Sequence, residues 1–312
     1  MSELMIGEIP VSQLVKQYQT PLYVYDEKQM VENIKAFKQG FQSDHFKTKI
    51  LYASKAFQTV AMLKLIQSQG LGLDVVSGGE IYTAVCADFP MEEVYFHGNN
   101  KTPAEIRYAI ENGLVHFVAD NLMEVELLVA LSQEYQKELQ VMIRLNVGIE
   151  AHTHEYVVTA HIDSKFGLLY ESEECQKAIQ FIQDSEFLQL EGFHAHIGSQ
   201  IFELSAWIAE IHKLIGYLKD FDEVLSLNLG GGFGIRYTES DQPLPIEESV
   251  RELVRFTEEA LKKQGLVINE LLIEPGRSIV GEAGTTLYTV GFIKQTPNKK
   301  YYFVDGGMTD NI

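Results

Sequence analysis

The chain has 312 residues, 25 of them basic and 44 acidic, and a formal net charge of −19. A surface this acidic argues against nucleic acid or an anionic membrane as a partner, so a small anionic ligand needs a local positive pocket. The length suits one large α/β barrel or two medium domains, and two cysteines provide no disulfide framework, which predicts a reducing, cytoplasmic compartment.

The N-terminal stretch "MSELMIGEIPVSQLVKQY" lacks the basic start and the continuous apolar core of a signal peptide. No stretch reaches the roughly 20 apolar residues that a membrane-spanning helix needs, so we expect a soluble protein. Cys86 lies in a helix-like stretch, whereas Cys175 lies in an acidic stretch typical of a surface.

From Lys49 onward, short apolar runs alternate with amphipathic helical stretches such as 102–112, 122–139 and 245–265. A helix is expected to start near Phe57, after the first run. Eight such units over about 230 residues predict a (β/α)8 TIM barrel, which we place at residues 27–283. The eight strand-like runs are "KILYASK", "LGLDVVSG", "VYFHGNN", "VHFVAD", "LQVMIRLN", "LEGFHAHIGS", "LSLNLGGG" and "LLIEPGR".

Both ends of the chain carry strand-like segments outside this pattern. "PLYVYD" precedes the first helix, and "TLYTVGFIKQ" and "KYYFVDGG" follow the eighth run with period-two alternation. We expect them to form a second, incomplete β domain from residues 1–26 and 284–312. The chain ends at "DGGMTDNI", before the further strands that such a domain needs.

Each predicted barrel strand ends in chemically capable side chains. In a TIM barrel the carboxyl ends of the strands meet at one face, where the active site lies. Any single position is explained as well by a capped strand end, but eight in succession indicate a site. They are Lys55, Asp74, His97 with Asn99 and Asn100, Asp120, Arg144 with Asn146, His194 with His196, Asn228, and Glu274 with Arg277.

Three adjacent glycines, Gly230, Gly231 and Gly232, directly follow the seventh predicted strand. Without side chains, their backbone N–H groups approach an anion closely, which predicts a phosphate site; a simple tight turn is the alternative. The run lacks the Lys and Ser/Thr of a nucleotide P-loop and does not match the dinucleotide fingerprint. Ser199, in the preceding loop, is a further candidate for the phosphate site, because TIM barrels often build phosphate sites from late loops.

Lys55 and Glu274 give this phosphate site a chemistry. A lysine that is desolvated at a barrel mouth is a nucleophile toward an aldehyde, and Glu274 supplies the carboxylate that keeps a pyridine nitrogen protonated. The His196 imidazole is able to stack on a flat ring. Each residue alone has a structural explanation, a surface lysine or a hydrogen-bonded histidine, but together they predict pyridoxal 5′-phosphate (PLP) as cofactor.

Several motifs of this chain resemble those of the diaminopimelate decarboxylases, lysine-biosynthetic enzymes of the alanine-racemase-like, fold type III PLP proteins. The resemblance extends from about Pro21 to Ile312. "EAHTHEYV", "DSKFG" and "EPGRSIV" distinguish it from ornithine and arginine decarboxylases. The other motifs are "YASKAF", "LDVVSGGEI", "YFHGNNKT", "GFHAHIGSQIF", "NLGGGFGI" and "DGGMTDN".

The resemblance implies PLP-dependent decarboxylation of meso-2,6-diaminopimelate to L-lysine and CO2, with Lys55, His196 and Glu274 as catalytic residues. Lys55 holds the cofactor aldehyde, His196 stacks on the ring and Glu274 pairs with its nitrogen, which favours decarboxylation over racemisation. The remaining implied cofactor contacts are Asp74, Arg144, Ser199, Gly230, Gly231, Gly232, Gly276 and Arg277, and Arg277 is also a candidate for a substrate carboxylate.

The sequence departs from the family pattern at Val147, where proline is common, and at Ala160, where glycine is usual. In the family, an arginine, a catalytic cysteine, an acidic residue and a tyrosine follow "DGGMTDN" and complete a site shared across a homodimer. We therefore expect these residues alone to be inactive and poorly soluble, and the full-length protein to be a homodimer that acts on a small amino acid.

Two alternatives stay open at this point. The chain length also suits a non-catalytic barrel that binds PLP for cofactor homeostasis, although such a barrel needs neither "EPGRSIV" nor flanking β strands. The second alternative is a related basic amino-acid decarboxylase, of the ornithine, arginine or carboxynorspermidine type.

Overall fold

The computed structural model describes residues 3–149 and 163–310. The chain divides into two compact units, residues 34–278 and residues 1–33 with 279–312. The divisions lie within two helices, α2 (Glu27–Gly40) and α10 (Arg277–Val280). The domain limits expected from the sequence, 1–26, 27–283 and 284–312, stay a prediction.

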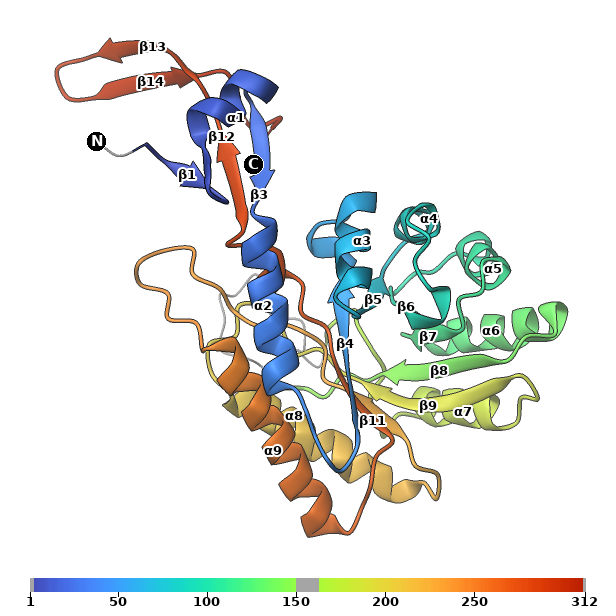
Figure 1. The fold of residues 1–312 in the computed structure, drawn as a ribbon. Coiled ribbons are helices and arrows are strands. Elements are labelled where there is room, and N and C mark those ends of the chain that lie inside the picture. The colour runs from blue at the N-terminus through green and yellow to red at the C-terminus, as the bar shows by residue number, and fades with distance from the viewer. Residues whose placement is uncertain (1–2, 150–162, 311–312) are drawn as a thin grey trace. The chain divides into compact units, whose positions relative to one another are not determined.

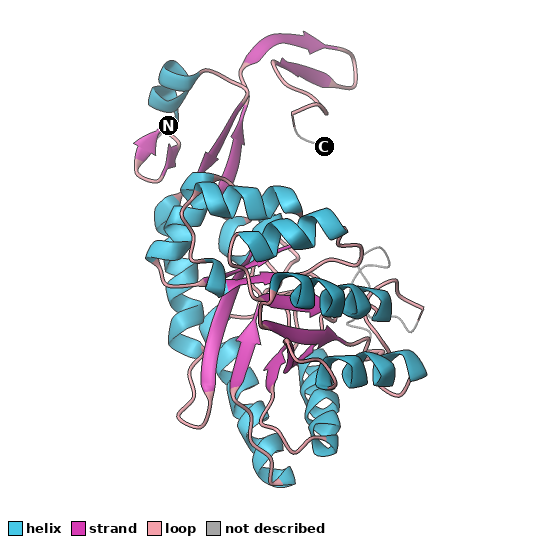
Figure 2. Ribbon diagram, turned by 90° about the vertical axis from the view of Figure 1, so that its right-hand side faces the viewer, coloured by secondary structure: helices cyan, strands magenta, loops and turns pink. Residues whose placement is uncertain are grey.

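The larger unit contains a closed barrel of eight parallel strands, which confirms the predicted TIM barrel (Figure 1). Neighbouring strands follow chain order, and the last pairs with the first through Ile273 and Ile50. Figure 2 shows helices around the outside of these strands. The barrel strands are β4 (Lys47–Ala53), β5 (Gly72–Val75), β6 (Val94–Phe96), β7 (His116–Ala119), β8 (Leu139–Arg144), β9 (Leu188–His194), β10 (Ser226–Asn228) and β11 (Glu270–Ile273).

The helices of this unit begin and end where the sequence provides caps. At α5, Thr102 and Glu105 form a capping box around Pro103, and α9 ends at Gly265 in the left-handed conformation. The helices are α3 (Val60–Ser68), α4 (Gly78–Cys86), α5 (Pro103–Glu111), α6 (Leu122–Tyr135), α7 (Glu173–Gln183), α8 (Ser205–Tyr217) and α9 (Ile246–Gln264), with 3-10 turns η1 (Ser54–Ala56), η2 (Met91–Glu93) and η3 (Leu218–Asp220).

A layer of apolar side chains fills the barrel beneath its mouth. Side chains along a strand alternate between the inside and the outside of a barrel, so the residue two positions after a member of this layer also points inward. That relation connects Tyr95 to His97 and Leu272 to Glu274, and it also applies to Asp120 and Arg144. The layer consists of Leu51, Tyr95, Val118, Met142 and Leu272.

The smaller unit combines segments from both chain ends, as predicted. Strand β3 (Leu22–Tyr25) pairs antiparallel with β12 (Gly284–Leu287), in register from Tyr25 and Gly284 to Leu22 and Leu287. The unit also contains α1 (Val11–Tyr18), a short pair β1 (Met5–Ile6) and β2 (Ile9–Pro10), and a hairpin of β13 (Val290–Gln295) and β14 (Lys300–Val304).

Two local predictions are wrong. Helix α3 begins at Val60, not near Phe57, because the Thr59 side chain accepts a hydrogen bond from Met62 N and caps the helix there. Cys175 is fully buried in α7 rather than at the surface, because it lies on the apolar face of that helix; Cys86 is exposed, and both thiols are free. Within the described residues, no helix has the length and apolar character needed to cross a membrane.

Candidate active site at the barrel mouth

Chemically capable side chains from five barrel strands meet at the mouth. Contacts link Asp74 on β5, His97 after β6, His194 on β9, Asn228 on β10 and Glu274 after β11. All five are at least 95% buried. We call them the mouth cluster. The convergence expected from the strand ends is therefore present.

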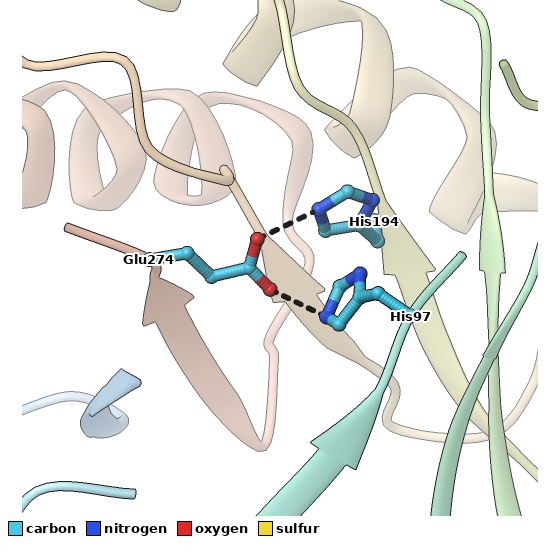
Figure 3. Close-up of side chains that lie close together, drawn as sticks. All are labelled: His97, His194 and Glu274. Carbon is cyan, nitrogen blue, oxygen red and sulfur yellow. Dashed lines mark hydrogen bonds and ion pairs between the residues drawn. The ribbon is translucent and has the colours of Figure 1, made fainter. Parts of the chain in front are cut away.

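Glu274 is the centre of this cluster (Figure 3). Asn228 Nδ2 donates to Glu274 Oε1 over 2.7 Å, His97 Nε2 lies 2.9 Å from the same oxygen, and His194 Nε2 lies 3.1 Å from Oε2. Burial alone raises the pKa of Glu274, but the two imidazoles outweigh it and hold the pKa well below its ordinary value. Glu274 is thus a buried carboxylate, the state required opposite a protonated pyridine nitrogen.

His194 supports this state as a neutral donor. Burial lowers its pKa to about 4, despite the opposing effect of Glu274. Because an ionised carboxylate only accepts hydrogen bonds, the proton of the neutral His194 ring is on Nε2. Ligand atoms of His97, His194 and Glu274 lie within 4.8 Å of one another, close enough for a metal ion. His194 Nε2 and Glu274 Oε2 are hydrogen-bonded at 3.1 Å, whereas His97 Nε2 contacts Glu274 Oε1 at 2.9 Å without the alignment of a hydrogen bond.

Lys55 lies in η1, directly after β4, with its Nζ 3.6 Å from Asp74 Oδ2. Its side chain is 54% exposed, so the prediction of a desolvated lysine is wrong: η1 places the side chain beyond the strand end rather than inside the barrel. Neither Asp74 oxygen has a hydrogen-bond partner within the described residues, although the side chain is buried. A buried carboxylate without donors is costly, and it provides a counter-charge for the amine.

A second carboxylate holds the turn that carries Lys55. Glu80 Oε2 accepts hydrogen bonds from Ser54 Oγ and from Val76 N, both over 2.7 Å. Burial raises the pKa of Glu80. Gly276 closes the other side of the turn, because a Cβ there would lie 3.0 Å from that of Ala53.

The glycine run is required by close packing. A Cβ on Gly231 would lie 2.2 Å from Glu274 O, and one on Gly232 would lie 2.5 Å from Gly198 O. The N–H groups of Gly230 and Gly231 donate to Asn228 Oδ1 and His196 Nδ1, whereas that of Gly232 has no partner in the described part of the chain.

His196 is positioned as a neutral ring. Burial lowers its pKa well below the ordinary value, and the nearby cations Lys55 and Arg144 lower it further. Its Nδ1 accepts from Gly231 N over 3.2 Å. An uncharged imidazole fixed to the glycine run is suited to lie flat against a ring. Ser199, the other predicted residue of this loop, is half-buried after β9.

Two arginines border the site. Arg144 lies 3.7 Å from Asp120 Oδ1 and 4.4 Å from the ring centroid of Phe166, and burial lowers its pKa. Arg277 is exposed at the start of α10, where its Nη1 contacts the Tyr237 hydroxyl. The segment "EAHTHEYV" and Ala160 lie outside the described residues, whereas Val147 is buried.

Sequence reasoning named His97, His194 and Asn228 as strand ends but gave them no role. The signal that could have given them a role is the alternation of side chains along each strand between the inside and the outside of the barrel. By this alternation the three side chains point inward, as Glu274 does. Glu80 was missed entirely, because its role depends on where α4 packs.

The residues at the mouth fit PLP. The Lys55 amine, beside the Asp74 carboxylate that has no hydrogen-bond donor among the described residues, suits the aldehyde. The Glu274 carboxylate suits the ring nitrogen, and the His196 imidazole suits the ring face. A glycine run that tolerates no Cβ, with one N–H still available, suits the phosphate.

Comparisons with known proteins also point to a PLP-dependent enzyme family. Residues 27–281 match the family model described as "Pyridoxal-dependent decarboxylase, pyridoxal binding domain". The chain is 47% identical to the diaminopimelate decarboxylase of Bacillus subtilis and 45% identical to that of Staphylococcus aureus, over 99% of this chain and 72% and 73% of theirs. The crystal structure of diaminopimelate decarboxylase from M. jannaschii in complex with L-lysine superposes with a TM-score of 0.88 at 31% identity, covering 97% of this chain and 75% of that one.

These matches extend over both units of the chain and include the predicted site residues 55–277. The chain belongs to the pyridoxal-dependent decarboxylases and, within them, to the diaminopimelate decarboxylase family.

Proposed function

We propose that the protein uses PLP to decarboxylate meso-2,6-diaminopimelate to L-lysine and CO2, the last step of lysine biosynthesis. Support comes from relatives named diaminopimelate decarboxylase, to which the chain is 44 to 47% identical. The structural observation that carries the proposal is that Glu274 is buried and ionised. A carboxylate opposite the ring nitrogen favours removal of an α-carboxyl group.

PLP, when bound, supplies an electron sink for the electron pair that remains on the α-carbon as CO2 leaves. The chain's own residues provide orientation. Glu274 would keep a proton on the ring nitrogen, and the neutral His196 ring would face the cofactor and exclude water. Lys55 Nζ, 3.6 Å from Asp74 Oδ2, would hold the cofactor through its aldehyde.

We assign the phosphate to Ser199, Gly276 and the run Gly230 to Gly232. Arg277 is exposed at the rim, and its guanidinium fits either the phosphate or a substrate carboxylate, since both are planar or tripodal oxyanions that accept paired N–H donors. Arg144 has a side chain that is only 12% exposed and lies 3.7 Å from Asp120 Oδ1, which suits it to shaping the field around the ring.

Cytoplasmic localisation and a homodimer complete the proposal. The first is inferred from the two free thiols, and the second from the resemblance to the family. Nucleic acid is not an expected partner, because the net charge is −19.

The first test is attachment of the cofactor. PLP added to the protein should give an absorbance band near the visible edge, and borohydride should fix the cofactor on Lys55, as located by peptide mass spectrometry. Lys55→Arg, which keeps the charge but not the primary amine, should lose the adduct. An adduct elsewhere, or none, would overturn the assignment of Lys55.

The second test is turnover by the complete protein that contains these residues. CO2 release should be faster from meso-diaminopimelate than from ornithine, arginine or lysine, and Lys55→Arg should reduce it by more than about 1,000-fold. Preference for another diamino acid would reassign the substrate. PLP attachment without CO2 release from any of them would favour the cofactor-homeostasis alternative.

A further inference from the structure

The two oxygens of the Glu274 carboxylate have different surroundings. Oε1 is contacted by Asn228 Nδ2 at 2.7 Å and by His97 Nε2 at 2.9 Å, whereas Oε2 is contacted by His194 Nε2 at 3.1 Å. A carboxylate offers about four lone-pair positions, two on each oxygen. Among the described residues, Oε1 therefore has two close nitrogen neighbours and Oε2 has one, which leaves Oε2 the more accessible oxygen for a further donor.

His97 differs from the other two donors because it also faces Asp74. Its Nε2 lies 3.9 Å from Asp74 Oδ1, and its short contact with Glu274 is not aligned as a linear hydrogen bond. His97 Nε2 thus lies between two buried carboxylates, closer to that of Glu274. Since Asp74 is the counter-charge of Lys55, His97 lies between the amine end and the carboxylate end of the site.

The backbone that carries His97 is held firmly. Gly98, the next residue, has a φ of +121°, a conformation that favours glycine. Lys101 Nζ donates to Gly98 O over 2.9 Å and to Val118 O over 2.7 Å, and pairs with Glu124 at 2.6 Å. This buried ammonium joins the turn after β6 to β7 and α6, so His97 has little freedom to move away from Glu274.

We propose that His97 is a positioning residue that decides which oxygen of Glu274 serves the cofactor. With Asn228 it occupies Oε1, so that Oε2 is the oxygen available to the ring nitrogen of PLP. The inference rests on the proposed function and goes beyond it, because it assigns a role to a residue that need not touch PLP.

His97 is a cleaner probe of this role than Asn228. The Asn228 side chain also accepts from Gly230 N over 2.9 Å, so its replacement disturbs the glycine run as well. His97 contacts the two carboxylates and lies edge-on to His194, with ring centroids 4.9 Å apart. Replacing it chiefly frees Oε1.

The test compares two ligands that differ only at the ring nitrogen. PLP and 1-deaza-pyridoxal 5′-phosphate, in which C–H replaces that nitrogen, are titrated into cofactor-free protein by calorimetry. In His97→Leu we expect PLP to bind about 10- to 100-fold more weakly, the effect of losing a charge-assisted contact, and the deaza analogue to change less than about twofold. Because both ligands carry the aldehyde and the phosphate, the difference isolates the Glu274 end.

His97→Gln and His116→Leu are the matched variants. Glutamine keeps an N–H donor and should restore most of the PLP affinity. His116 pairs with Glu191 at 2.8 Å lower in the same barrel, so His116→Leu should lower the melting temperature but change neither affinity by more than about twofold.

Equal weakening of both ligands in His97→Leu would overturn the proposal, because it would indicate a merely structural role. If His97→Leu does not fold, as cofactor-free melting would show, His97→Phe, which keeps a ring but has no N–H donor, carries the test, and an unequal loss of PLP affinity is again the expected result. Wild-type protein that bound neither ligand would instead refute the proposed function, and with it this inference.

Discussion

Two histidine–glutamate groups occupy the same barrel, and their surroundings differ. In the mouth cluster, Glu274 is hydrogen-bonded to His194 and Asn228 and contacted by His97. Both oxygens of Asp74, His97 Nε2 and His194 Nδ1 have no hydrogen-bond partner among the described residues. At the side of the apolar layer away from the mouth, Glu191 accepts from the hydroxyl of Tyr95, a member of that layer, over 2.8 Å. Glu191 also lies 2.8 Å from His116 Nδ1, and the His116 ring stacks 4.2 Å from that of Tyr95. We call Tyr95, His116 and Glu191 the lower cluster.

The difference separates a structural network from a site. In the described part of the chain, none of the buried polar atoms without a partner belongs to the lower cluster. Unpaired buried groups cost free energy, and folding alone favours networks in which every member is satisfied. The mouth cluster keeps such groups at the open ends of the strands, where a ligand is able to satisfy them.

The same substitution made in both clusters tests most directly whether one is a functional site and the other a structural network. Glu274→Gln removes the charge opposite the ring nitrogen and should reduce CO2 release by the complete protein by about 100- to 1,000-fold. Glu191→Gln should leave turnover within about threefold but cost about 1–2 kcal/mol of unfolding free energy, because Tyr95 and His116 lose a charged acceptor. Assays of kcat and urea unfolding measure both. Similar losses of turnover would abolish the distinction.

A second comparison concerns glycines. Gly231→Ala places a Cβ 2.2 Å from Glu274 O and should cost about 1–3 kcal/mol of unfolding free energy, together with PLP affinity, because backbone must move. Gly216 lies in α8, where an added Cβ would meet no atom of the described residues within 4 Å, so Gly216→Ala should stabilise the protein by about 0.5–1 kcal/mol. Urea unfolding and PLP titration test both variants; a well-tolerated Gly231→Ala would contradict the need for close approach.

Glu210 on α8 provides a third case: it is buried and has no hydrogen-bond partner among the described residues, but we assign it to no site. It is 0% exposed, neither oxygen has a hydrogen-bond partner in the part of the chain that the structure describes, and burial, with a smaller contribution from Glu274, raises its pKa well above the ordinary value of 4.5. Glu210→Met should therefore stabilise the protein by about 1–2 kcal/mol near neutral pH, with unchanged PLP affinity.

The pH dependence of this gain has a definite sign. The folded state binds the Glu210 proton more tightly than the unfolded state, so wild-type stability falls as pH rises above 4.5 toward the folded pKa. The advantage of Glu210→Met should be small at about pH 5 and larger at about pH 8, as measured by urea unfolding. A gain independent of pH would indicate that packing, and not the carboxyl group, is responsible.

The sequence by itself determined the architecture and the identity of the chemistry. Eight apolar runs ending in polar residues were sufficient for the barrel, because the carboxyl ends of parallel strands share one face. Residues such as Lys55, Glu274 and the run Gly230 to Gly232 indicated PLP from their side-chain chemistry, which does not depend on coordinates. That segments from both chain ends form a second β unit could also be predicted, and the structure adds that β3 pairs with β12.

Only the tertiary structure decided how these groups are paired. That His97 and Asn228 share Oε1 of Glu274, that Lys55 is half exposed, and that Glu80 holds its turn all depend on packing between segments far apart in the chain. The burial of Cys175 and Glu210 was likewise hidden, because helix periodicity gives a face but not what covers it. Ionisation states follow from such contacts, since distance and burial, which no local pattern encodes, set the energies of charges.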